Sequence, residues 1–371
     1  MFWRFVVVSA LLVSGSAGSA LAMQNVVSVS GSDILLNGSP VKILGLRCSN
    51  ALISDATERR LIGHLDVFKS YGLNTVSVFF MGSRFGDVKG YRPDASLDPV
   101  YAARMGRIIE AADARDMIVL VGCLYWSTSR AKEDLGHWTQ QEANLAVANT
   151  IRWLKEHDYR NVFVDVDNEG MAHDATDWSI ASMIDAAHAV DPTIMIAYND
   201  GDAPPTNADL YVHHSKPVPG KPWLDSESTV GRPNDGYWGA YSKVTHQKTE
   251  GEYYNYSRIG RYTEGMKKRQ IALTRKGMEE FNGNMLASTW LQCAPDEGIG
   301  GPFMTPGGHS NIADVDKDVD VLHPDAGVLW WLEWVRDHYG PGAKQARAAH
   351  KEAGGQVVIE AEHYAGKAAS T

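Results

Sequence analysis

Residues 162–169 read Val-Phe-Val-Asp-Val-Asp-Asn-Glu, a run rich in residues that favour strands, and it ends in Asn168 and Glu169. A short run rich in valine and bounded by polar residues is typical of a strand. A second run of this kind covers residues 221–227, Lys-Pro-Trp-Leu-Asp-Ser-Glu, and ends in Glu227. If both strands belong to one parallel sheet, their terminal carboxylates lie at the same edge of it.

Short apolar runs alternate with helical patterns on both sides of these two strands, which predicts a parallel sheet with crossover helices. The expected strands cover residues 41–46, 74–80, 117–122, 162–167, 193–197, 210–213, 223–226 and 285–289. The expected helices cover residues 57–71, 99–114, 139–157, 175–190, 259–281 and 327–338. Eight strands are the number that closes a (β/α)8 barrel, so the predicted fold is an α/β TIM barrel.

The links before residues 210 and 223 are short for parallel crossovers, which usually need about a dozen residues or more. We therefore expect reduced helices around the fifth to seventh strands. A small hairpin around Asn37-Gly38 should precede the first strand, because this dipeptide favours a tight hairpin turn. In such barrels the catalytic groups lie at the carboxyl ends of the strands, where Glu169 and Glu227 close the fourth and seventh strands.

Both ends of the chain predict segments outside the barrel. Residues 1–22 contain an early arginine, an apolar run and an Ala-Leu-Ala ending, the order of a secretory signal peptide. The barrel is expected over residues 23–342, followed by a polar linker over residues 343–355 and a single strand within residues 356–371. The mature protein should be secreted (extracellular or periplasmic) and should have no membrane attachment after signal cleavage.

Composition narrows the class of partner. The net charge of −10 argues against nucleic acid, because a protein that binds phosphates needs a basic face. The chain has 11 Trp and 15 Tyr, which suit a sugar-binding cleft as well as a core. Cys48, Cys123 and Cys293 lack the spacing of a structural zinc site, and we expect three buried thiols. A bridge between Cys48 and Cys293 remains an alternative, and no cofactor is expected.

Two carboxyl groups that face each other across a barrel mouth match the needs of glycoside hydrolysis. One must be protonated to release the leaving oxygen, and the other must be ionised. The two strand ends also resemble the clan A glycoside hydrolases, such as family five, in which Asn-Glu closes the fourth strand and Glu the seventh. Trp290, just after the eighth strand, matches the aromatic platform under the sugar next to the cleaved bond.

The resemblance implies specific roles. Glu169 would be the general acid/base, Glu227 the nucleophile, and Asn168 a hydrogen-bond partner of the sugar 2-hydroxyl. It implies a retaining mechanism on a polysaccharide or oligosaccharide. The final run Ile359-Glu360-Ala361-Glu362 resembles the opening of β-sandwich carbohydrate-binding modules of families six and thirty-five. This second resemblance implies the start of a truncated module and a polymeric substrate.

The chain also departs from the family-five pattern. Ser77 stands where the second strand usually has an arginine, and residues 123–126, Cys-Leu-Tyr-Trp, stand where the third strand has a histidine. Gly170 replaces the proline that often follows Asn-Glu. We expect Arg47, at the end of the first strand, or Arg84 to supply the missing cation.

Further residues are predicted at the mouth of the barrel. His213 and His214, at the sixth strand, would orient the second glutamate or contact substrate. Tyr125, Trp126 and Tyr198 would line sugar subsites, although packing is an equally good interpretation of each.

Two other functions stay open. A non-catalytic sugar-binding barrel is suggested by the missing arginine and histidine, and its binding would survive loss of either glutamate. A metal-dependent barrel hydrolase would use the His213-His214 pair together with Asp165 or Asp167, and a chelator would inactivate it. The acidic stretch over residues 314–320 imitates a calcium loop but lacks the required glycine, so we interpret it as a solvated loop.

Overall fold

The computed structural model describes residues 23–82, 88–126, 130–228, 264–287, 329–341 and 343. Several sequence predictions lie outside these ranges: the signal peptide, Arg84, Trp290, Cys293, the acidic loop, residues 344–355 of the linker and the final strand. Cys48 and Cys123 lie within them and are buried and unbridged.

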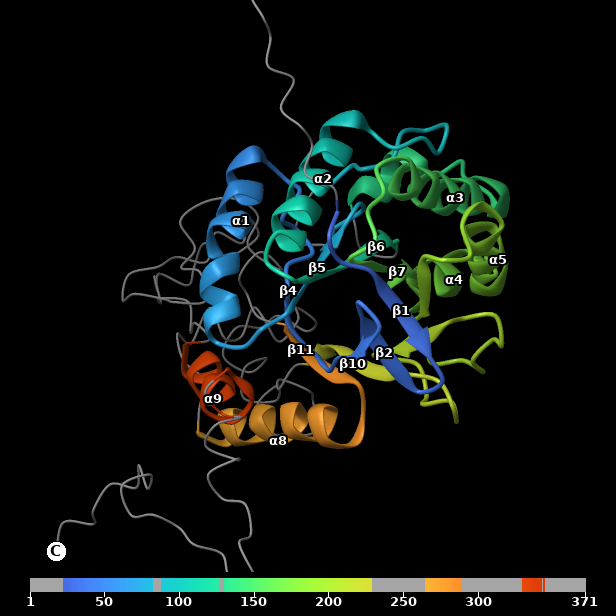
Figure 1. The fold of residues 1–371 in the computed structure, drawn as a ribbon. Coiled ribbons are helices and arrows are strands. Elements are labelled where there is room, and N and C mark those ends of the chain that lie inside the picture. Colours follow the sequence, from blue (N-terminus) through green and yellow to red (C-terminus); the bar gives the residue numbers. More distant parts are fainter. Residues whose placement is uncertain are drawn as a thin grey trace, which may run out of the picture.

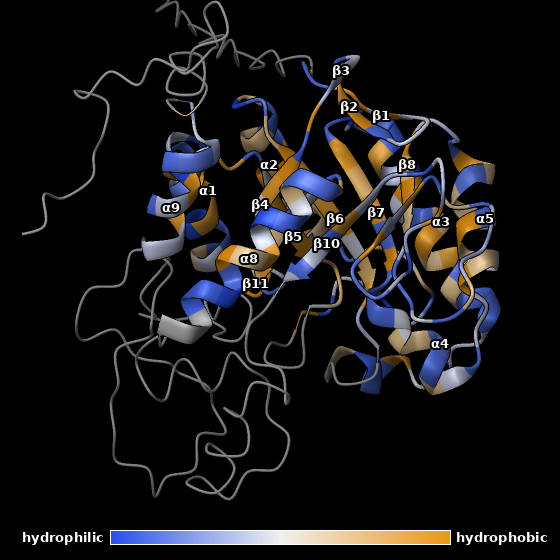
Figure 2. Cartoon of the chain, turned by 90° about the horizontal axis from the view of Figure 1, so that it is seen from below, coloured by the Kyte–Doolittle hydropathy of each residue, from blue (hydrophilic) through white to orange (hydrophobic). Residues whose placement is uncertain are grey.

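Eight parallel strands form a closed barrel (Figure 1). In barrel order they are β4 (Ile43–Arg47), β5 (Thr75–Phe79), β6 (Ile118–Leu124), β7 (Val162–Asp167), β8 (Met195–Tyr198), β9 (Leu210–Val212), β10 (Trp223–Ser228) and β11 (Gly283–Ala287), which pairs with β4. The predicted TIM barrel is therefore confirmed. Figure 2 shows that the strands are mostly apolar, as expected for strands covered on both faces.

The helices that cover the barrel are α1 (Asp55–Ser70), α2 (Pro99–Asp113), α3 (Gln140–Glu156), α4 (Met171–Thr176), α5 (Ile180–Val190), α8 (Glu264–Glu280) and α9 (Leu329–Tyr339), with short 3-10 helices η1 (Arg130–Leu135) and η2 (Asn168–Gly170). Local sequence sets their starts. Ser54 and Thr139 form capping boxes at α1 and α3, and Asp98 caps α2 ahead of Pro99. None of these described helices is long and apolar enough to cross a membrane.

The predicted loss of helices is confirmed: residues 199–209 and 213–222, which link β8 to β9 and β9 to β10, contain no helix. The helix expected over residues 175–190 is confirmed over residues 180–190, but its continuity before residue 180 is wrong. It is divided into α4 and α5, because Asp177 adopts a left-handed conformation (φ 64°) and Ser179 starts a new helix by accepting a hydrogen bond from the Ser182 N–H.

A three-stranded sheet, β1 (Val27–Ser30), β2 (Asp33–Leu36) and β3 (Ser39–Pro40), contains the predicted hairpin at Asn37-Gly38. The Val27 N–H donates to the carbonyl of Arg160, and the Asn282 amide donates to the carbonyl of Ser32. Arg160 lies two residues before β7 and Asn282 one residue before β11, so this sheet lies at the amino end of the barrel. The carboxyl ends of the strands are at the opposite end.

Candidate active site

Glu169 and Glu227 lie at the carboxyl ends of two barrel strands. Asn168 and Glu169 follow β7 in η2, and Glu227 lies near the end of β10. Glu169 has φ 55° and ψ 24°, a left-handed conformation that is costly for a residue with a side chain. Such backbone strain is typical of functional sites.

Arg47 joins the two strand ends. Its Nη2 contacts the Asn168 Oδ1 at 2.5 Å and the Glu227 Oε2 at 2.9 Å. The Arg47 side chain is fully buried, and the Glu227 side chain is 5% exposed. Arg47 lies directly opposite Ser77 in the β4–β5 register. The first strand therefore places a cation beside the position where the second strand lacks one.

Aromatic rings hold the Arg47 guanidinium. Its central carbon lies 4.7 Å from the ring centre of Phe79 and 5.7 Å from that of Tyr125. Gly122 makes this arrangement possible, because a side-chain carbon there would lie 1.9 Å from the Phe79 ring. Burial, and then the charge of Glu227, raise the pKa of Tyr125 well above its usual range. Tyr125 is thus close to both the cation and a carboxylate.

His213 bridges two carboxylates. Its Nδ1 lies 2.9 Å from the Asp225 Oδ1, and its Nε2 lies 3.2 Å from the Glu169 Oε1. The sequence predicted that this histidine would orient Glu227 or contact substrate, and in the structure the carboxylates that it bonds are Glu169 and Asp225. Sequence reasoning missed Asp225. Its signal was the strand period of two, which puts it on the same face of β10 as Glu227.

Glu169 and His213 shift each other's pKa toward the charged forms. Burial alone would raise the pKa of Glu169, but the hydrogen bond and charge of His213, followed by His214 and Arg47, lower it to about 2. Burial would lower the pKa of His213, but its bonds to Asp225 and Glu169 raise it to about 10. At neutral pH the pair is an imidazolium beside a carboxylate, and it holds one transferable proton.

We expect His213→Gln to destabilise the protein in a pH-dependent way. The raised pKa of His213 stabilises the fold fully below about pH 6.5, and this contribution is lost as pH rises toward about 10. The lowered pKa of Glu169 adds stability above about pH 4.5 that is lost as pH falls toward about 2.

Thermal melts of wild type and His213→Gln should therefore differ most between about pH 5 and 6.5 and converge toward pH 10. His137→Gln is the control, since His137 is exposed and bonds the backbone carbonyl of Pro93 and no buried carboxylate. A difference in melting temperature that does not vary with pH would contradict the ion pair.

Two buried aspartates lie behind the mouth. Asp165 accepts a hydrogen bond from Asn199, and burial raises its pKa to about 6. Asp167 accepts from the N–H groups of Ala172 and His173, and burial raises its pKa to about 8 despite these bonds. The metal-dependent alternative required Asp165 or Asp167 to bind an ion together with His213 and His214. In the structure, both aspartates instead accept hydrogen bonds from other groups.

Gly170 explains one departure from the family pattern. Its φ of 64° excludes proline, whose ring holds φ near about −65°. A side-chain carbon at Gly170 would lie 2.5 Å from the Asp200 Oδ1. Asp200 cannot easily move, because it is 6% exposed and accepts hydrogen bonds from Tyr198 Oη and the Gly201 N–H.

Gly170→Ala should therefore lower the free energy of unfolding by about 3 kcal/mol, the sum of backbone strain and a forced shift. Gly31→Ala is a matched control, because Gly31 has φ 58° but nothing within 4 Å of the added carbon. It should cost only about 1 kcal/mol, the strain alone. Equal costs in urea unfolding would show that the Asp200 contact is unimportant.

The other predicted aromatics are packed. Trp126 is 6% exposed, with its ring stacked on Trp138 at 5.8 Å and edge-on to Trp178 at 4.7 Å. Tyr198 is 3% exposed, and its hydroxyl donates to Asp200. The packing interpretation accounts for both. His214 is different: its side chain is 42% exposed and its Nε2 lies 4.0 Å from the Glu169 Oε1.

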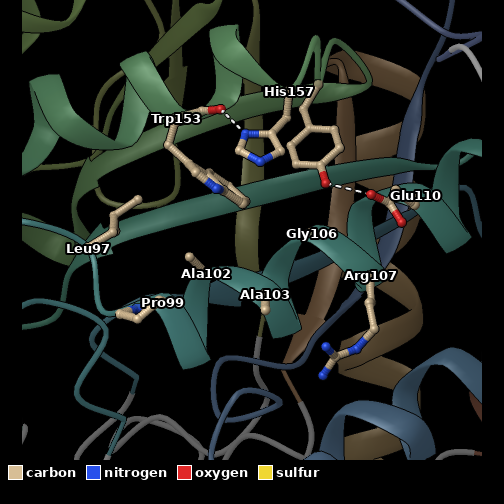
Figure 3. A pocket seen from close by; sticks show the side chains of 10 residues that line it. Leu97, Pro99, Ala102, Ala103, Gly106, Arg107, Glu110, Trp153 and His157 are labelled. Atoms are coloured by element: carbon tan, nitrogen blue, oxygen red, sulfur yellow. Dashed lines mark hydrogen bonds between the residues drawn. The ribbon is translucent and has the colours of Figure 1, made fainter. Parts of the chain in front are cut away.

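A cavity of about 540 Å³ lies away from these carboxylates, between α2 and the end of α3 (Figure 3). Trp153 and His157 line one side of it. Tyr159 is also among its lining residues, and its hydroxyl donates to Glu110. None of the residues predicted for the site lines this cavity. It is a gap between two outer helices and is separate from the mouth.

Comparisons with known proteins establish the fold. No family model matches the chain, and no curated protein matches its sequence. One similar solved structure is the β-glucanase SdGluc5_26A from Saccharophagus degradans in complex with cellotetraose, with a TM-score of 0.53, 14% identity, and coverage of 86% of this chain and 95% of that one. Another is a putative glycoside hydrolase from Bacteroides vulgatus, with a TM-score of 0.53, 11% identity, and coverage of 90% and 63%.

Proposed function

We propose that this protein is a retaining glycoside hydrolase that acts on a polysaccharide or oligosaccharide, with Glu227 as nucleophile and Glu169 as general acid/base. The observation that supports this most directly is the different pairing of the two carboxylates. Glu227 is paired with a buried cation, Arg47, which favours its ionised form. Glu169 is paired with His213, which holds a proton beside it.

The reaction follows from these pairings. A Glu227 oxygen attacks the anomeric carbon while the glycosidic bond breaks, and the leaving oxygen takes the proton of the Glu169–His213 pair through Glu169. A covalent glycosyl-enzyme results. Water then attacks the same carbon and gives a proton to Glu169, which frees Glu227 and retains the configuration. Asn168, held by Arg47, would bond the sugar 2-hydroxyl.

The test is release of reducing sugar from a panel of polysaccharides, followed by proton NMR of the first product. The panel starts with β-glucans, since the β-glucanase of similar fold is described with cellotetraose. We expect cleavage with the anomeric configuration retained at early times. Inversion would contradict the nucleophilic role of Glu227. Binding without cleavage, unaffected by loss of either glutamate, would support the non-catalytic sugar-binding barrel.

Export and a carbohydrate-binding module belong to the same proposal, although residues 1–22 and 356–371 lie outside the described structure. A secreted enzyme that degrades a polymer would use both. Expression of the full chain in a bacterial host, with N-terminal sequencing of the exported product, tests the signal peptide. We expect cleavage after Ala22.

A further inference from the structure

Three potential metal ligands converge at the mouth of the barrel. The Glu169 carboxylate and the His213 and His214 imidazoles each offer one atom, and these atoms lie within 4.8 Å of one another. The Glu169 Oε1 is 3.2 Å from the His213 Nε2 and 4.0 Å from the His214 Nε2. Two histidines and one carboxylate are a common zinc ligand set, with bonds of about 2.0–2.2 Å.

The surroundings of His213 suit a metal ligand. Asp225 bonds the Nδ1, so the Nε2 faces Glu169. A metal-bound histidine typically donates its other ring nitrogen to a carboxylate in this way. Since His213 is 3% exposed and Glu169 19%, both are held by their surroundings. His214 is 42% exposed and stacks on His213 at 4.5 Å, and its ligand atom already lies within 4.8 Å of those of Glu169 and His213.

We propose that Glu169, His213 and His214 form a zinc site, and that zinc bound there inhibits the enzyme by occupying its acid/base carboxylate. The inhibition rests on the proposed function, whereas the binding does not. A bound ion occupies the space between the Glu169 Oε1 and the His213 Nε2 and takes the carboxylate oxygen as a ligand, so Glu169 can neither protonate a leaving oxygen nor accept a proton from water. Nitrogen ligands favour zinc and similar transition metals over magnesium and calcium.

A second cluster of potential ligands, His173, Asp200 and Asp202, is less suitable. The His173 Nδ1 already bonds the Trp178 carbonyl, and the Asp202 side chain is 76% exposed. Asp200 is engaged by Tyr198 and Gly201. This cluster provides a matched control, because it has a histidine near carboxylates at the same end of the barrel.

The experiment is isothermal titration of zinc chloride into the chelator-treated full-length protein. We expect one ion per chain in the mouth site. His214→Ala should weaken binding at least tenfold, and Asp225→Asn about 10–100-fold, the usual effect of losing an outer partner of a ligand. His173→Ala should bind as wild type does, and magnesium should not compete.

Hydrolysis is measured in parallel on the substrate found by the panel. Activity should fall in proportion to zinc occupancy and return with a chelator. Zinc binding that survives both His214→Ala and Asp225→Asn, or that is lost in His173→Ala, would overturn the site. Zinc that stimulates hydrolysis would overturn the inhibition and support the metal-dependent alternative.

The two proposals fail separately. Zinc binding without hydrolysis of any sugar would contradict the glycosidase function and support the metal site. Hydrolysis without zinc binding would contradict the metal site and support the glycosidase function. A circular dichroism melt of each variant establishes that it folds. Cys48 and Cys123 do not compete for the ion, because both are fully buried.

Discussion

Glu227→Gln is expected to lower kcat/KM by about a thousandfold or more on every substrate that the wild type cleaves. The amide keeps the shape of the side chain but cannot attack the anomeric carbon, so the covalent intermediate cannot form. The measurement is steady-state hydrolysis of the natural polysaccharide and of an aryl glycoside. Glu110→Gln is the control, since Glu110 accepts a hydrogen bond from Tyr159 on the outer face of the barrel.

Glu169→Gln should behave differently, because a general acid matters most for a poor leaving group. On the polysaccharide its loss should also be about a thousandfold, within the range for general acid catalysis. On a dinitrophenyl glycoside, whose leaving group needs no proton, the first step should stay close to the wild-type rate. A burst of dinitrophenol in rapid mixing would report this step.

Azide distinguishes the two roles further. It should restore turnover to Glu169→Ala and give a glycosyl azide of retained configuration, and it should give the inverted azide with Glu227→Ala. The opposite pattern would exchange the roles of the two glutamates. Undiminished cleavage in both variants would remove them from the mechanism altogether.

The second large effect is expected for Arg47. Arg47→Met removes the buried cation that contacts both Asn168 and Glu227, so it should lower kcat/KM by at least about a hundredfold through lost positioning and charge. The acidic limb of the pH–rate profile should move to higher pH, since Glu227 loses the group that favours its ionised form.

Stability should fall as well, because Glu227 would remain buried without the charge of Arg47 beside it. Breaking a buried pair in this way costs about 3–5 kcal/mol. Arg47→Lys keeps the charge but not the planar guanidinium between Phe79 and Tyr125, so it should fold better than Arg47→Met and still lose activity. Arg115→Met, which breaks the exposed pair with Asp66, is the control. Full activity in Arg47→Met would show that Arg47 does not replace the arginine that the family-five pattern has on the second strand.

Much of the fold could be predicted from local sequence. The strand over residues 162–167 was predicted with both ends correct, because an apolar run bounded by polar residues determines a buried parallel strand locally. The short links before residues 210 and 223 predicted the missing helices for a similar reason: a crossover helix needs a minimum chain length. The division of the helix near Asp177 was missed, because a left-handed residue other than glycine has no clear local signal.

The barrel and the positions of Glu169 and Glu227 at strand ends could be predicted without the structure, since hydrophobic periodicity and strand length are local properties. The sequence also proposed Arg47 as the missing cation, but equally with Arg84. Which side chains contact one another at the mouth could be seen only in the folded barrel. Arg47 contacts Asn168, 121 positions away, and His213 turns to Glu169 and Asp225 because barrel closure and strand register bring those strand ends together. Contacts of this kind depend on the packing of the whole barrel, which no short stretch of sequence contains.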